Sequence, residues 1–101
     1  MNERQILSLL KTGQVAFHHP LKLHFQPGTG EFGVSVPKRN FKRAVKRNLL
    51  KRRIREAYRL NRGRLGDKDY DIFIYYIGKE EEDYGRIEKS LIAILDDLAA
   101  R

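Results

Sequence analysis

The pattern of hydrophobic and polar positions changes its period along the first third of the chain. In residues 3–12 apolar side chains recur at helical spacing and Gly13 follows as a typical helix stop, which predicts a short helix. Residues 21–25 alternate apolar and polar positions, the period of a half-buried strand. Residues 15–17 and 32–36 are expected to form two more strands. The Gly-rich turn before the last of these strands predicts a hairpin with residues 21–25.

A long helix, a strand and a second long helix are predicted for the rest of the chain. Residues 43–60 contain no Gly or Pro and are rich in helix-forming Arg, Lys, Leu and Ala. Residues 70–77 are dense in β-branched and aromatic side chains and predict the strongest strand. Residues 84–100 place their apolar side chains on one face, as in an amphipathic helix. The order α-β-β-β-α-β-α predicts a two-layer α+β sandwich in a single domain, residues 1–101.

Positive charge is concentrated in one block of this pattern. The chain has a formal net charge of +8 at pH 7. Residues 38–64 hold 13 Lys/Arg and one acid (+12), whereas residues 1–37 carry +1 and residues 65–101 carry −5. Like charges at this density repel one another, and a polyanionic partner would relieve that repulsion. The block therefore indicates binding to a polyanion. Nucleic acid is the favoured partner, and an anionic membrane surface is the less favoured alternative.

Amino-acid composition limits the cellular compartments in which the protein is expected. The chain has no cysteine, so it has neither a disulfide framework nor a thiolate metal site, which is typical of a reducing cytoplasm. No apolar run approaches the roughly 20 residues that span a bilayer. The first residues lack a basic segment followed by an apolar one, so secretion is not expected. We therefore expect a cytoplasmic protein.

On a helix, the basic block becomes one-sided. Six polar side chains fall within about 100° of one another at 100° per residue; they are Asn48, Lys51, Arg52, Arg55, Arg59 and Arg62. Five apolar side chains lie roughly opposite and are expected to face the sheet: Leu49, Leu50, Ile54, Ala57 and Leu60. Lys46 and Arg53 intrude on the apolar side and are expected to reach outward at its edges. The cationic face has no acid to pair with, which favours phosphate over a merely solvated or membrane-lying helix.

Two sequence stretches resemble the signature of one family. These are Phe32-Gly-Val-Ser-Val-Pro-Lys38 and Ala44-Val-Lys-Arg-Asn-Leu-Leu-Lys-Arg-Arg-Ile-Arg-Glu-Ala-Tyr58. Together they closely resemble the bacterial ribonuclease P protein component, and the likeness extends over nearly the whole chain. The resemblance implies that family's fold: one central mixed sheet with a left-handed β-α-β crossover.

The resemblance also implies a function. It implies a non-catalytic subunit of an endoribonuclease, a hydrolase whose chemistry is carried by an RNA that removes the 5′ leader from precursor tRNA. The implied partners are ribonuclease P RNA and precursor tRNA, without a membrane or a small-molecule cofactor. Magnesium would be held mainly by the RNA, so no catalytic or metal-binding side chain is assigned to the protein.

Two sets of site residues are expected. Those predicted to bind the RNA subunit lie on the basic helix or at its start: Arg43, Lys46, Arg47, Asn48, Lys51, Arg52, Arg55 and Arg59. The resemblance implies a leader-binding cleft between the first helix and the sheet, with Phe17, Lys22, His24, Ser35 and Lys38 as candidates. Leu49 stands where the motif usually has a third polar residue, arginine, so one phosphate contact is missing and Lys46 or Arg53 is a candidate to compensate.

Other functions remain open from the residues alone. A structural RNA-binding protein, ribosomal or chaperone-like, would have a similar charge pattern. An autonomous nuclease would need a cluster such as His18, His24 and Asp69 or Asp71, which no spacing demands. Tyr75 and Tyr76 are expected to pack in the sheet, and the acidic residues 80–83 are expected to form a solvated loop.

Overall fold

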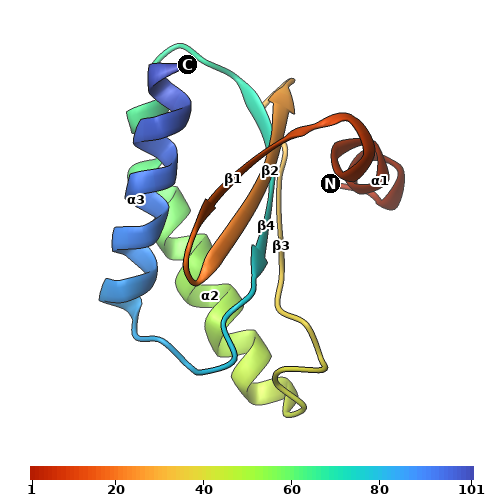
Figure 1. Ribbon diagram of the computed structural model, residues 1–101, viewed down its shortest axis with the longest axis vertical. Helices are drawn as coiled ribbons and strands as arrows, with labels where there is room; N and C mark the ends of the chain where they lie inside the picture. Colours follow the sequence, from red (N-terminus) through yellow and green to blue (C-terminus); the bar gives the residue numbers. More distant parts are fainter.

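The computed structural model describes all residues, 1–101, and confirms the predicted order of elements (Figure 1). The elements are α1 (Glu3–Thr12), β1 (Gln14–His18), β2 (Leu21–Pro27), β3 (Phe32–Ser35), α2 (Ala44–Asn61), the 3₁₀ turn η1 (Arg62–Leu65), β4 (Tyr70–Tyr76) and α3 (Tyr84–Ala100). No helix is both long and apolar enough to cross a membrane.

The four strands form one mixed sheet in the order β1-β2-β4-β3. β1 pairs with β2 and β2 with β4 in antiparallel fashion, whereas β3 and β4 are parallel and are connected through α2. The predicted hairpin of β2 with β3 is wrong, because β4 lies between them. Asp71 of β4 accepts hydrogen bonds from the backbone N–H groups of Thr29 and Glu31, both at 3.0 Å. The turn after β2 is thus held on β4 and does not fold back onto β2.

The main core lies between the sheet and the helices α2 and α3, which cover one face (Figure 1). α2 contributes Leu50, Ile54, Ala57 and Tyr58 to this core. Tyr58 was not among the residues expected to face the sheet, but its ring stacks on that of Phe32 at 4.1 Å and 5°. Of the residues expected there, Leu60 is 56% exposed and Leu49 is only half-buried. The buried arc is therefore rotated toward β3, where an aromatic stack is available.

The opposite face of the sheet is covered by α1 alone (Figure 1). α1 begins with a capping box, in which the side chains and backbone N–H groups of Asn2 and Gln5 bond reciprocally. It buries Leu9 completely against the sheet, while Leu7 and Leu10 remain exposed. His24, on the polar face of β2, is buried as a result. Because α1 is short, much of this outer face stays open.

Candidate nucleic-acid interface

The predicted cationic ridge lies on the outward face of α2. Arg43, Lys46, Asn48, Arg52, Arg55 and Arg59 are exposed, and Arg47 and Lys51 are half-buried. Four of these cations make no hydrogen bond or ion pair within the protein: Arg43, Lys51, Arg52 and Arg55. Their charges are therefore available to a ligand.

The other three cations are bonded within the protein. Arg47 donates from Nη1 to the carbonyl oxygens of Phe41 (2.8 Å) and Lys42 (2.9 Å), and so ties the segment before α2 to the helix. Lys46 lies 3.7 Å from Glu81. Arg59 pairs with Glu56 one turn earlier, and this hydrogen bond lowers the pKa of the Glu56 carboxyl. The expectation that the cationic face has no acid to pair with is therefore wrong at this one position.

The acidic segment 80–83 is a largely exposed loop, as expected, but it also contacts α2. Arg53 donates to the Glu82 carbonyl oxygen at 2.7 Å and lies 3.4 Å from a Glu81 carboxylate oxygen. The buried Tyr76 hydroxyl anchors the loop, since it donates to the Glu80 carbonyl oxygen and accepts from the backbone N–H of Glu82. Lys46 and Arg53 thus reach toward these acids, and their charges are partly neutralised before any ligand arrives.

The N-terminus of α2 is unusually positive. No acidic residue lies in its first turn, and Arg43 at the cap position makes no side-chain capping bond. A helix N-terminus already carries a partial positive charge that favours anions. Here that charge is reinforced by cations where acids would normally balance it. This end of the ridge should therefore attract phosphate most strongly.

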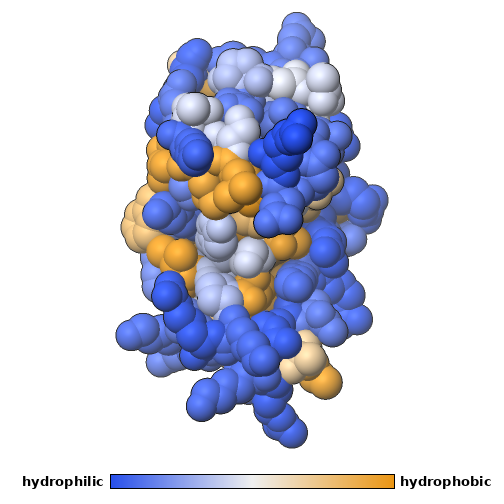
Figure 2. All heavy atoms as spheres, turned by 90° about the vertical axis from the view of Figure 1, so that its right-hand side faces the viewer, coloured by the Kyte–Doolittle hydropathy of each residue, from blue (hydrophilic) through white to orange (hydrophobic).

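A groove of about 480 Å³ lies on the outer face of the sheet, between the end of α1 and the segment after β3. Its lining residues are Leu10, Lys22, His24, Ser35, Pro37, Arg39, Asn40, Tyr75 and Ile77. Three predicted cleft residues line it: Lys22, His24 and Ser35. The sheet register places Lys22 and Ser35 beside Tyr75, one on each neighbouring strand. Figure 2 shows this face, on which apolar and near-neutral surface runs down the middle with hydrophilic side chains around it.

Two of the predicted cleft residues do not line the groove. Phe17 lies opposite Lys22 on the edge strand β1 and is 63% exposed, so it extends the same face of the sheet by one strand. Lys38 is exposed in the segment after β3, next to Pro37, which forms part of the groove wall. Both residues border the groove without entering it.

Sequence reasoning missed several groove residues. The same packing in the sheet is expected of Tyr75 and Tyr76, but adjacent strand residues point to opposite faces. Tyr76 is fully buried in the core, whereas Tyr75 lines the groove. The period-2 pattern of β4 contained this distinction. Arg39 and Asn40 lie in an irregular segment whose path no periodicity reveals.

The groove has an aromatic floor whose packing depends on a glycine. A Cβ atom on Gly33 would lie 2.7 Å from the Phe73 ring, so only glycine allows that ring to lie over β3. Phe73 packs edge-on to Tyr75 at 5.0 Å, and Tyr75 packs edge-on to His24 at 5.8 Å. These rings hold one another in place beneath the groove.

His24 is an uncharged member of this floor. Its side chain is buried and its Nδ1 atom has no hydrogen-bond partner in the protein. Burial, and secondarily the charge of Lys22, lower the pKa of His24 below its usual 6.5. The imidazole is therefore neutral at pH 7, and the positive charge in the groove comes from Lys22 and Arg39.

The family model for ribonuclease P matches residues 1–99. The chain belongs to the ribonuclease P protein family. The ribonuclease P protein component of Porphyromonas gingivalis is 32% identical over 99 residues, covering 86% of this chain and 72% of the relative. That of Clostridium botulinum is 44% identical over 64 residues, 62% of this chain and 57% of the relative.

Solved structures of the family have the same fold. The ribonuclease P protein of Thermotoga maritima superposes with a TM-score of 0.81 at 25% identity, covering 96% of this chain and 94% of that one. The Staphylococcus aureus protein has the same TM-score at 22% identity, covering 96% of this chain and 91% of that one, a likeness of fold alone.

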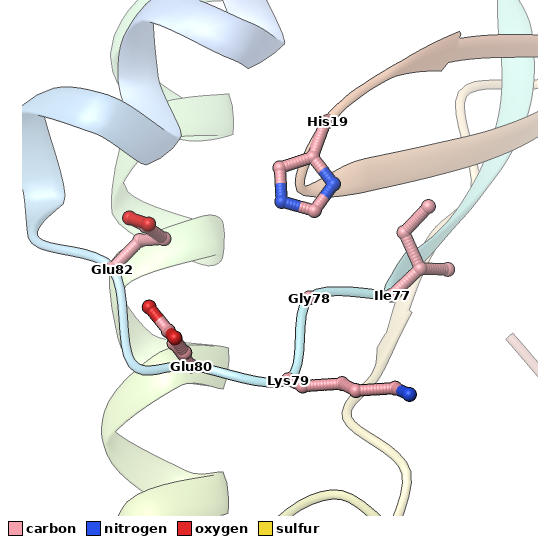
Figure 3. Close-up of a pocket in the computed structure, with 6 residues that line it drawn as sticks. All are labelled: His19, Ile77, Gly78, Lys79, Glu80 and Glu82. Atoms are coloured by element: carbon pink, nitrogen blue, oxygen red, sulfur yellow. The ribbon is translucent and has the colours of Figure 1, made fainter.

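A second hollow, of about 420 Å³, lies beyond the β1–β2 turn and differs from the groove in charge. His19 faces it from the turn, and Glu80 and Glu82 face it from the acidic loop, whereas Lys79 points away (Figure 3). The carboxylates that face this hollow are those of the two glutamates. The hollow therefore does not extend the cationic surface of this ribonuclease P family protein.

Two of the residues considered for an autonomous nuclease, Asp71 and His24, have other contacts. The Asp71 carboxylate holds the turn after β2, and His24 is enclosed by the aromatic floor. A Cβ atom on Gly28 would lie 2.2 Å from the Asp71 carboxylate, so the turn closes directly on this group. No three His, Asp or Glu side chains come close enough together to hold a metal ion.

Proposed function

We propose that this chain is the protein subunit of a ribonuclease P, in which a catalytic RNA removes the 5′ leader of precursor tRNA. The observation that carries the proposal is a row of four unpaired cations on one helix of a chain that matches the ribonuclease P family over residues 1–99. Membership of the family supports the assignment to ribonuclease P, and the row of cations is the surface that we propose binds its RNA.

α2 is the proposed docking surface for ribonuclease P RNA. Arg52 and Arg55 are exposed and unpaired on neighbouring turns, and an arginine guanidinium binds phosphate with two parallel hydrogen bonds. Arg43 and Lys51 add unpaired charge along the same helix. These cations would contact RNA phosphates, which fix position and carry no sequence information.

The outer groove is the proposed site for the leader. Single-stranded RNA is bound by a positive groove that follows the backbone and by aromatic rings on which bases stack. Lys22 and Arg39 supply the charge and Tyr75 the ring, with Phe17 on the adjoining edge strand. The groove lies on the face of the sheet that α2 does not cover, so the two RNAs can be bound together.

We assign no catalytic residue and no metal ligand to the protein. Magnesium at the scissile phosphate would be coordinated mainly by the RNA, where it would activate water and stabilise the leaving oxygen. The protein would act by position and charge: it would hold the leader beside the RNA and reduce repulsion between two polyanions. We place this reaction in the cytoplasm, which suits a chain without cysteine.

The test is reconstitution at low magnesium with ribonuclease P RNA and a precursor tRNA. The proposal predicts that adding the protein increases leader removal, and that the protein without RNA cleaves nothing. Binding to the RNA without any gain in cleavage would instead indicate a structural RNA-binding protein. Cleavage by the protein alone would indicate an autonomous nuclease.

A further inference from the structure

An apolar notch interrupts the cationic ridge of α2. Val45 is 79% exposed, the highest value among the large hydrophobic side chains that are exposed. Leu49 follows one turn later and is half-buried. Together with Asn48 and Arg52 these two side chains line a hollow of about 430 Å³ on the helix surface.

The fold does not account for this notch. Val45 and Leu49 are not members of the buried core cluster. Valine is a weaker helix former than alanine or leucine, and an apolar side chain as exposed as that of Val45 gains no burial energy from folding. Exposed apolar surface on a binding face is typical of an interaction site. Val45 therefore contributes little to folding, and both side chains line surface that a ligand can reach.

The charges around the notch select the class of ligand. Arg52 is unpaired beside it, and Arg43 is unpaired at the start of the same helix. These positive charges would not attract a protein with a basic or neutral surface. They would attract an anionic polymer, and flat apolar faces on that polymer would fit the notch. An unpaired nucleotide of RNA has both properties, a phosphate and an exposed base.

We propose that the notch holds one unpaired nucleobase of the RNA on which α2 docks. The base lies against Val45 and Leu49, the Asn48 amide meets its polar edge, and Arg52 binds the adjoining phosphate. This inference rests on the proposed function, because it requires that α2 docks on RNA. It assigns Leu49 a contact different from the phosphate contact of the arginine that the family motif usually has there.

The test compares two apolar-to-polar substitutions on the same helix. Leu49→Ser removes the apolar wall of the notch, and Leu60→Ser is the matched control, since Leu60 is exposed and does not line the notch. Binding to ribonuclease P RNA is measured over a range of salt concentrations. Leu49→Ser is expected to weaken binding about 5- to 10-fold with an unchanged salt slope, because a base contact releases no counterions. Leu60→Ser is expected to change binding less than about twofold.

Failure of the inference is distinguishable from failure of the proposed function. If the unaltered protein does not bind the RNA, the proposed function fails. If it binds and Leu49→Ser binds equally well, the notch proposal is overturned while the function stands. A change of oligomeric state in Leu49→Ser, with RNA affinity intact, would overturn it in favour of contact with a second copy.

A second measurement locates the nucleotide. Val45 is replaced by a benzophenone amino acid and irradiated in the complex, with thermal unfolding as a check on the fold. The proposal predicts cross-links concentrated at one unpaired nucleotide of the RNA. Cross-links spread along duplex backbone would contradict it.

Discussion

Individual cations of α2 differ in what they already bind. Arg47 holds two backbone carbonyl oxygens of the segment before the helix, whereas Arg55 has no partner in the protein. The segment that Arg47 holds continues from the wall of the groove. Arg47 is therefore both a candidate RNA contact and a structural residue that fixes where one proposed site lies relative to the other.

Replacing these two arginines should separate the two roles. Arg47→Ala is expected to lower the free energy of unfolding by about 1–2 kcal/mol, because two charge-assisted hydrogen bonds are lost at a partly exposed site. Arg55→Ala is expected to change it by less than about 0.5 kcal/mol and to flatten the salt slope of RNA binding by about one charge. Denaturant unfolding and salt-dependent binding measure the two effects, and an unchanged slope in Arg55→Ala would argue against a phosphate contact there.

His24 should make stability depend on pH. Its pKa is lowered in the folded protein, so the unfolded chain binds the proton more tightly. Its contribution to stability is present above pH 6.5, and declines as the pH falls from there to the lowered folded pKa. His24→Gln should flatten this part of the stability profile, with exposed His18→Gln as control. Direct titration of His24 by NMR would contradict the account if its pKa were not below 6.5.

Secondary-structure elements were largely predictable, while their pairing was not. The helical pattern of residues in α2 and α3 predicted the ends of both helices to within about one residue of those observed. β4 lies between β2 and β3, and Asp71 of β4 holds the turn after β2 through a contact across 42 residues, which no local pattern encodes. The stack of Tyr58 on Phe32 likewise required knowing that α2 lies beside β3. Local periodicity determines elements, and long-range contacts determine their neighbours.

The contact between the acidic loop and α2 should weaken RNA binding. Glu81 lies near both Lys46 and Arg53, so phosphate must compete with it for these cations. Glu81→Gln is therefore expected to tighten RNA binding about threefold at low salt and to steepen the salt slope. Glu80→Gln is the matched control, because it removes the same charge without an ion pair to α2. Equal gains in both variants would show that net charge alone is responsible.

At the scale of the whole molecule, charge and shape divide the protein into distinct surfaces. α2, which carries the ridge, lies on one side of the sheet and α1 on the other (Figure 1). The groove lies on the side of α1, with Leu10 of that helix in its lining. The sequence predicted the ridge well, because it lies on one continuous helix. The groove was predicted only in part, since its wall comes from α1, three strands and an irregular segment that meet only in the folded chain. Lys22, His24 and Ser35 were identified through the family resemblance, whereas Arg39 and Asn40 were not.

The most direct test of the two-surface account compares precursor tRNA with mature tRNA in the reconstituted enzyme. The account predicts that the protein increases affinity for tRNA carrying a leader and not for mature tRNA. It also predicts that Tyr75→Ala removes this leader-dependent gain while assembly with the RNA subunit is retained, and that Arg55→Ala weakens assembly instead. An equal gain for both tRNAs, unchanged by Tyr75→Ala, would contradict the assignment of the groove to the leader.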